Sequence, residues 1–196
     1  MRGVRAAAAA AAALLLLAGC TGDGGGHRPA DVADQGYVSG DGTMVTWPAG
    51  ERPGPVELSG TDFSGAAVDV TDWRGDVVLL NTWYANCGPC RAEAPDLAQI
   101  AEDYAARGVH LLGINGTDAA GSVDAFQRRF DVPYVSLDDR DGSVTAALQG
   151  VVPISAVPTT VLLDRDGDVA ARVLGLADPS TLRTVLDDLL AEEPAS

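Results

Sequence analysis

The stretch VVLLNTWYANCGPCRAEAPDL, residues 77–97, decides what kind of domain this chain forms. It opens with the aliphatic run Val77–Leu80, which is typical of a strand covered on both faces of a sheet. A Cys-Gly-Pro-Cys motif follows at Cys87 and Cys90, and the residues after it show helical spacing. The sequence therefore places two thiols where a central strand turns into a helix.

This placement favours redox chemistry at the cysteine pair. Unpaired backbone N–H groups and the helix dipole stabilise a thiolate at a helix N-terminus. We expect Cys87 to be the accessible, readily ionised nucleophile that attacks a disulfide of another protein. We expect Cys90 to resolve the mixed disulfide. Pro89 fits the first turn of the helix, because its fixed φ is helical and no N–H is needed there.

Short apolar runs alternate with helical stretches on both sides of the motif, which predicts an α/β fold with a central mixed sheet flanked by helices. Before the motif we expect a hairpin in Val56–Val70, with its turn at residues 63–65. After it, the spacing predicts a helix over Gly88–Arg107, interrupted by Pro95, and an inserted helix over Ser122–Phe130. The remaining predicted elements are strands at Val109–Ile114, Tyr134–Leu137, Thr159–Leu163 and Val169–Leu174, and helices at Asp141–Gly150 and Pro179–Ala191.

The N-terminal residues predict export and a lipid anchor. Residues 1–19 have the pattern of a bacterial lipoprotein signal peptide, with a basic start and an apolar run shorter than the roughly 20 residues that span a bilayer. Cys20 would then carry the lipid, which leaves Cys87 and Cys90 as the redox pair. A secreted chain without lipid on Cys20 is the alternative.

Two further segments complete the predicted organisation. Residues 20–55 are rich in Gly, Asp and Pro and show no sustained period, so we expect a flexible tether. Residues 56–196 should form the folded domain. This arrangement would hold the domain at the extracytoplasmic face of a bacterial cell membrane.

The charge and the histidines limit the classes of ligand. A net charge of -15 gives no attraction to nucleic-acid phosphates, so nucleic acid is not an expected partner. A zinc site needs about four ligands, whereas the chain offers the cysteine pair, His27 in the predicted tether and His110 in a predicted strand. We expect no metal, no other cofactor and a monomer. An inert structural disulfide is a further alternative, although so short a loop gives little chain-entropy stabilisation.

The motif and its flanks resemble a known family. From about residue 56 to residue 190, the chain is similar to thioredoxin-fold proteins of the TlpA and ResA type, which are membrane-tethered thiol-disulfide oxidoreductases. The resemblance implies a thioredoxin fold with an N-terminal β-hairpin and an inserted helix. The matching features are Trp83, the motif at Cys87 and Cys90, Glu93, Pro95, and Val157–Pro158, which resembles the family's cis-proline loop.

The resemblance also implies roles for single residues. Glu93 would accept or relay the proton of Cys90, while its place near a helix start would by itself favour dipole complementarity. The residue before Pro158 would pair with substrate backbone, with an ordinary trans proline as the alternative. Asp118 approximately matches a second acid of the family. The substrate-binding residues implied in this way are Trp83, Gly88, Pro89, Val157 and Pro158.

Two positions depart from thioredoxin itself. Asn81 stands where thioredoxin has a buried Asp, and Asn86 where it has a Trp directly before the first cysteine. Both changes favour the TlpA branch. They leave the substrate surface around Asn86 undefined.

The function expected from these features is a disulfide reductase that acts on protein thiols and disulfides outside the cytoplasm. Its electrons would come from a membrane electron-transfer protein, since an envelope site is oxidising. Apocytochrome c, during cytochrome c maturation, is a substrate implied by the resemblance alone. The alternatives are a disulfide-forming oxidant and a non-catalytic binding lipoprotein. Peroxide reduction is less favoured, because Leu80 and Tyr84 stand where a peroxiredoxin would carry Pro and Thr.

Overall fold

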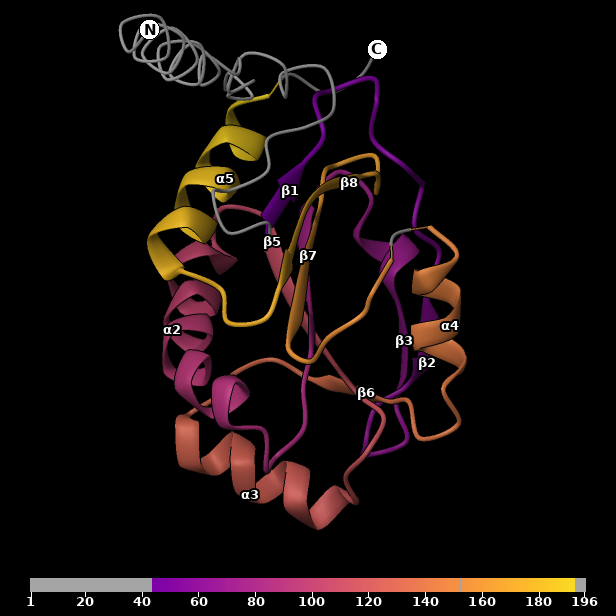
Figure 1. Ribbon diagram of the computed structural model, residues 1–196, viewed down its shortest axis with the longest axis vertical. Coiled ribbons are helices and arrows are strands. Elements are labelled where there is room, and N and C mark those ends of the chain that lie inside the picture. Colours follow the sequence, from indigo (N-terminus) through magenta and orange to yellow (C-terminus); the bar gives the residue numbers. More distant parts are fainter. Residues whose placement is uncertain (1–43, 152, 193–196) are drawn as a thin grey trace, which may run out of the picture. The chain divides into compact units, whose positions relative to one another are not determined.

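The computed structural model describes residues 44–151 and 153–192, and these form a mixed six-stranded sheet with helices on both faces (Figure 1). The strand order is β1-β8-β7-β4-β5-β6, and a separate two-stranded sheet pairs β2 with β3. The predicted thioredoxin fold is confirmed. The strands are β1 Met44–Thr46, β2 Ser59–Thr61, β3 Ala67–Asp69, β4 Val77–Thr82, β5 Val109–Asn115, β6 Ser136–Asp138, β7 Thr159–Leu163 and β8 Val169–Leu174.

The centre of the sheet is β4, as its aliphatic sequence predicts. All six of its residues are buried, and it pairs in parallel with β5 and antiparallel with β7. Because both neighbours satisfy its backbone, its side chains enter the cores on both faces. This strand carries the chain directly toward Cys87.

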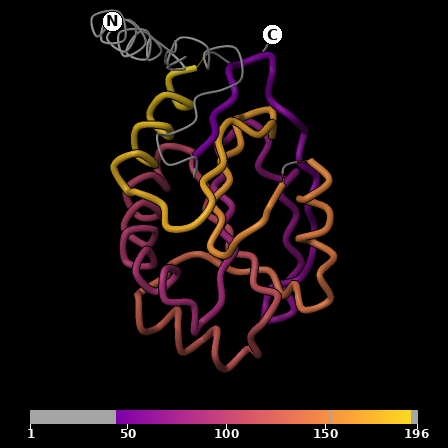
Figure 2. The backbone as a smooth tube through the Cα atoms, viewed as in Figure 1, coloured from indigo at the N-terminus to yellow at the C-terminus, as the bar shows by residue number. Residues whose placement is uncertain are grey.

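The helices divide between the two faces and one end of the sheet. In Figure 2, α2 and α5 lie side by side on one face, where they cover a core that includes Leu79 and Leu162. The hairpin β2–β3, the 3-10 helix η2 and α4 cover the other face, over Leu80 and Leu112. The helices are α2 Gly88–Ala105, α3 Ala120–Phe130, α4 Ser143–Gln149 and α5 Pro179–Ala191, with η2 at Val70–Trp73.

Helix α2 begins at the cysteine motif. Cys87 is its N-cap residue, and a proline occupies the first turn, where its missing N–H costs nothing. The helix continues through Pro95 and buries one side, which includes Leu97 and Ile100. It ends at Ala105, two residues before the predicted end. This helix therefore ties the cysteine motif to the main core.

The predicted tether, residues 20–55, extends too far along the chain. Strand β1, Met44–Thr46, lies within it and pairs antiparallel with β8. Further on, the N–H of Val169 donates to the carbonyl of Pro53 at 2.8 Å. Arg52 also forms ion pairs with Asp164 and Glu192. The folded domain thus begins before residue 56. The sequence did not indicate this, because a three-residue edge strand among Gly and Pro leaves no periodic signal.

The N-terminal predictions lie outside the described residues. This applies to the signal peptide at residues 1–19, to the lipid attachment at Cys20 and to His27. Among the described helices, none combines the length and the apolar character that crossing a bilayer requires.

Candidate active site

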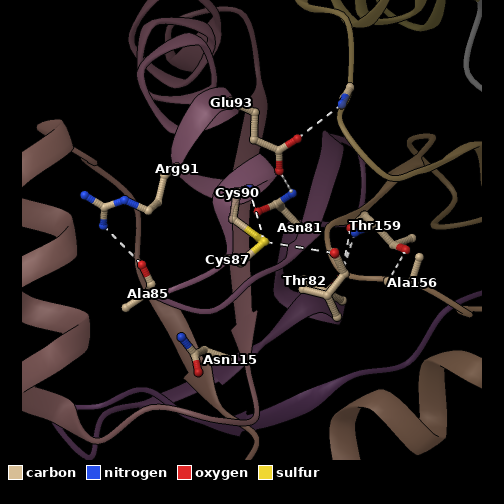
Figure 3. The surroundings of a disulfide bond; sticks show 12 residues. Asn81, Thr82, Ala85, Cys87, Cys90, Arg91, Glu93, Asn115, Ala156 and Thr159 are labelled. Carbon is tan, nitrogen blue, oxygen red and sulfur yellow. Dashed lines mark hydrogen bonds between the residues drawn. A yellow bond between two sulfur atoms is a disulfide. The ribbon is translucent and has the colours of Figure 1, made fainter.

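The two cysteines of the motif form a disulfide at the N-terminus of α2 (Figure 3). The backbone N–H of Cys90 points at Cys87 Sγ, at an N···S distance of 3.1 Å. The sulfur of Cys87 therefore caps the first turn of the helix. On reduction, this N–H and the helix dipole would stabilise negative charge on Cys87.

The disulfide is less accessible than the sequence suggests. Cys87 is 3% exposed and Cys90 is 2% exposed. The expectation of an accessible Cys87 is therefore wrong for this oxidised state, because the aromatic cluster of Trp83 and Phe126 packs against the pair. Gly88 and Pro89, which lie between the cysteines, are exposed.

The predicted cis-proline loop faces Cys87. The Val157–Pro158 peptide bond is cis, and the carbonyl oxygen of Val157 lies 4.0 Å from Cys87 Sγ. Thr159 fixes the loop, because its N–H donates to Thr82 Oγ1 at 2.8 Å and its hydroxyl donates to the Ala156 carbonyl at 2.7 Å. Val157 itself is 46% exposed. The loop thus presents an apolar side chain and backbone groups beside the disulfide.

Glu93 is a buried carboxyl one turn beyond Cys90. It is 2% exposed, and it accepts hydrogen bonds from Asn81 Nδ2 at 2.9 Å and from the backbone N–H of Ala177 at 3.2 Å (Figure 3). Burial raises the pKa of Glu93 from 4.5 to about 7, and the two hydrogen bonds oppose part of that rise. Near neutral pH the group can therefore give or take a proton.

Trp83 lies behind the disulfide and is 5% exposed. Its indole N–H donates to Ser136 Oγ at 3.0 Å, and its ring packs on Phe126 with centroids 4.2 Å apart. The resemblance implied that Trp83 contacts substrate. Its burial does not support that role and fits packing against the cysteine pair instead.

Asp118 and Arg91 hold the loop that leads into Cys87. Asp118 Oδ2 accepts the backbone N–H of Ala85 at 2.6 Å, and Arg91 Nη1 donates to the carbonyl of Ala85 at 3.1 Å. Asn115, which is fully buried, donates to the same Asp118 oxygen at 2.9 Å. Both backbone polar groups of Ala85 are thus hydrogen-bonded. Asp118, predicted only as an approximate match, therefore contacts the chain two residues before the nucleophile.

Two residues near Glu93 were missed by the sequence analysis. Asn81 was noted as a departure from thioredoxin, yet its amide joins Glu93 to Thr160 Oγ1. Tyr134 was placed only in a strand, yet it lines a small cavity together with Cys90. A polar residue at the end of a buried run is the signal that marks Asn81. No local pattern marks Tyr134, because its place depends on the fold.

His110 does not join the site. Its Nε2 pairs with Asp76 at 2.9 Å and its ring stacks on Trp73 with centroids 4.7 Å apart. Within residues 44–151 and 153–192, no group of three or more His, Cys, Asp or Glu side chains could hold a metal ion.

Solved structures share this architecture. A secreted thiol-disulfide isomerase from Corynebacterium glutamicum is 30% identical, covers 80% of this chain and 98% of its own, and has a TM-score of 0.70. A DsbF homologue from Corynebacterium diphtheriae is 29% identical, covers 78% and 96%, and has a TM-score of 0.67.

Sequence comparison agrees with the structures. The thiol-disulfide oxidoreductase ResA of Geobacillus kaustophilus is 32% identical over 100 residues, which are 51% of this chain and 55% of that protein. The chain spans about half the length of the curated relatives it matches. The AhpC/TSA family matches residues 53–172. The chain therefore belongs to the AhpC/TSA redoxin family and is a homologue of thiol-disulfide oxidoreductases, with Cys87 and Cys90 as its CxxC pair.

Proposed function

We propose that this domain exchanges disulfides with cysteines of other proteins and works mainly as a reductase. The observation that carries the proposal is the place of the disulfide. Cys87 caps the first turn of α2, and its Sγ lies 4.0 Å from the carbonyl oxygen of Val157, which is exposed and precedes the buried cis Pro158. The sulfur of Cys87 thus lies both at a helix N-terminus that stabilises a thiolate and beside a backbone carbonyl that can orient a bound polypeptide.

The proposed reaction begins from the reduced pair. The Cys87 thiolate attacks one sulfur of a client disulfide, and the other client sulfur leaves with the bonding electrons and takes up a proton. Cys90 then loses its proton, and its thiolate attacks Cys87 Sγ. The bond between Cys87 and the client breaks, and the client sulfur leaves with its electron pair. The client disulfide is reduced and the Cys87–Cys90 pair is oxidised.

Glu93 is the proposed acceptor of the Cys90 proton. Its burial one turn from Cys90 and its pKa of about 7 support this role, because the carboxylate is present near neutral pH and is basic enough to take a proton. Replacement Glu93→Gln should remove the inflection near pH 7 from the rate of the resolving step. A variant whose rate keeps that inflection would exclude Glu93 as the base.

The client is proposed to bind across the exposed residues beside Cys87. Gly88, Pro89 and Val157 are exposed, and the Val157–Pro158 loop is held in place by Thr159. Backbone pairing with Val157 would align the client sulfur with Cys87. Trp83 supports the pair from behind and is not part of this proposed surface.

Export, a lipid anchor on Cys20 and a signal peptide at residues 1–19 remain proposals. They are supported by the N-terminal sequence and by the secreted relative from Corynebacterium glutamicum. A membrane electron-transfer protein as reductant and apocytochrome c as client are proposed on the resemblance to ResA-type proteins. The mature mass tests the anchor, because a chain without the diacylglyceryl increment on Cys20 would contradict it.

The exchange itself is tested by insulin reduction. Wild type should reduce insulin disulfides in the presence of dithiothreitol, and Cys87→Ser should not. Equal rates for the two, or no activity in wild type, would favour a non-catalytic binding module. Alkylation of the reduced protein across pH gives a second check, since an inert Cys87 thiol would end the enzymatic account.

The reduction potential of the Cys87–Cys90 pair tests whether the domain reduces or forms disulfides in its clients. Equilibration with glutathione and with dithiothreitol should give a potential near that of thioredoxin for a reductase, and near that of DsbA for a disulfide-forming oxidant. Mixed disulfides trapped with Cys90→Ser in cells would identify the clients. Peroxide reduction is not proposed, because Leu80 and Tyr84 replace the Pro and Thr expected of a peroxiredoxin.

A further inference from the structure

A small cavity lies beside Cys90, and the exchange described above assigns it no role. Its volume is about 10 Å³, which is room for about one water molecule. Cys90, Asn81 and Tyr134 line it, and much of the remaining wall is apolar and includes Phe126. The resolving cysteine therefore lines a small cavity with few polar groups.

An ionised Cys90 in this place needs a hydrogen-bond donor. Cys90 is 2% exposed, and burial away from water disfavours a charged thiolate relative to the neutral thiol. Its own backbone N–H is already directed at Cys87 Sγ at 3.1 Å. A further donor could come from the residues that line the cavity.

Most donors on that wall are already used. The side-chain amide of Asn81 donates to Glu93 at 2.9 Å and to Thr160 at 3.2 Å. The indole N–H of Trp83 donates to Ser136. The Tyr134 hydroxyl has no hydrogen-bond partner within the described part of the chain. Tyr134, a partly exposed residue that lines the cavity, therefore carries a side-chain donor that no described protein group uses.

The other charged groups near Cys90 do not replace this donor. Glu93 is acidic, and its two oxygens are held by Asn81 and the Ala177 N–H. Helix α3 contributes apolar side chains, Val123 and Phe126, to the cluster around the cysteine pair. Arg91 points away from the disulfide, toward the carbonyl of Ala85 (Figure 3). Burial and then the charge of Glu93 raise the pKa of Tyr134, so its phenol keeps its proton at neutral pH.

We propose that Tyr134 is a positioning residue for the resolving step, which donates its O–H to the Cys90 thiolate directly or through one water in the cavity. This inference rests on the proposed exchange and deepens it. The proton of Cys90 still goes to Glu93, and the electron pair of the thiolate forms the bond to Cys87. Tyr134 is neither oxidised nor reduced and keeps its proton throughout.

The test is the pKa of Cys90 in a full-length chain with Cys20→Ser and Cys87→Ser, where Cys90 is the one remaining thiol. NMR of its Cβ carbon across pH reports the ionisation. Adding Tyr134→Phe should raise the pKa of Cys90 by about one unit, which is a tenfold loss of thiolate at a fixed pH below it. Tyr84→Phe is the matched control, because this ring packs against the cluster that contains Cys87 and Cys90 without lining the cavity. An unchanged pKa in Tyr134→Phe overturns the proposal.

A second variant covers the case in which Tyr134→Phe does not fold. A ring-fluorinated tyrosine at position 134 keeps the side-chain shape and makes its O–H a stronger donor, so it should lower the pKa of Cys90. No change, or a rise, would again overturn the proposal. Both titrations are made without turnover. A failure of the exchange itself would appear separately, as the absence of insulin reduction by wild type.

Discussion

At the residue scale, Glu93 stands out because burial disfavours the ionised form of its carboxyl. The carboxyl is 2% exposed, and each of its oxygens accepts one N–H group. Because the folded-state pKa of about 7 lies above the unfolded value of 4.5, the folded protein binds the proton more tightly. This contribution to stability is complete below pH 4.5 and is lost as the pH rises through 7.

Glu93→Gln should therefore flatten the pH dependence of stability. The difference in pKa corresponds to roughly 3 kcal/mol, so wild type should lose about that much unfolding free energy between acid and mildly alkaline pH, relative to the variant. Urea unfolding of the oxidised proteins at several pH values measures it. Parallel curves for the two proteins would show that Glu93 is not the group that titrates.

Asp118→Ala should weaken the loop before the nucleophile. It removes the acceptor of the Ala85 N–H and of the Asn115 amide, which costs about 1–3 kcal/mol for a donor left unsatisfied. The insulin reduction rate should fall together with stability, because Cys87 lies two residues further on. Glu102→Ala, an exposed carboxyl on α2, is the control and should change neither. Unchanged stability in Asp118→Ala would contradict the structural role.

At the element scale, the contact between β4, β5 and β6 depends on one glycine. A Cβ placed on Gly113 of β5 would lie 2.7 Å from Trp83 Nε1 and much closer still to Ser136 Oγ. These are the two groups that form the hydrogen bond behind the disulfide. The absence of a side chain at Gly113 therefore leaves space for Trp83, which follows β4, to contact Ser136 of β6.

Gly113→Ala should destabilise the domain by about 1–3 kcal/mol through overpacking, and it should alter the fluorescence of Trp83. Thermal unfolding and tryptophan emission measure the two effects. Gly121→Ala in α3 is the matched control, since nothing lies within 4 Å of its added Cβ and alanine favours a helix. If both variants unfolded at the same temperature, the close approach at Gly113 would not contribute to the stability of the domain.

The predictability of the elements followed the strength of their local patterns. The strand at Val77–Leu80 and the helix from Gly88 were predicted because a continuous apolar run and a Cys-Gly-Pro-Cys turn are strong signals. Strand β1 was missed because it has three residues and draws its stability from β8. Tyr134 was missed as a site residue because its neighbours Cys90 and Asn81 come from other elements.

At the scale of the whole domain, Arg52 joins segments that are far apart in the chain. It lies before the first hairpin and pairs with Asp164, in the turn between β7 and β8, at 2.8 Å. It also pairs with Glu192, after α5, at 2.6 Å. The Arg52 side chain is 8% exposed, so these pairs are only partly screened by water.

Arg52→Ala should lower the free energy of unfolding by roughly 2–4 kcal/mol, because it leaves two carboxylates without their cation. Chemical unfolding measures the loss. Arg140→Ala is the control, since its pair with Asp138 is exposed and should be worth less than about 1 kcal/mol. Equal losses in the two variants would show that Arg52 contributes no more than an ordinary surface charge.

The loop between β8 and α5 connects the two sides of the site. The N–H of Gly175 donates to the carbonyl of Pro158 at 2.8 Å, and two residues later the N–H of Ala177 donates to Glu93. Binding of a polypeptide at the cis-proline loop and protonation of Glu93 therefore both affect residues 175–177. By thermodynamic reciprocity, a bound polypeptide that draws the Ala177 N–H away from the carboxylate raises the affinity of Glu93 for its proton, and protonation of Glu93 strengthens the binding of that polypeptide by the same factor.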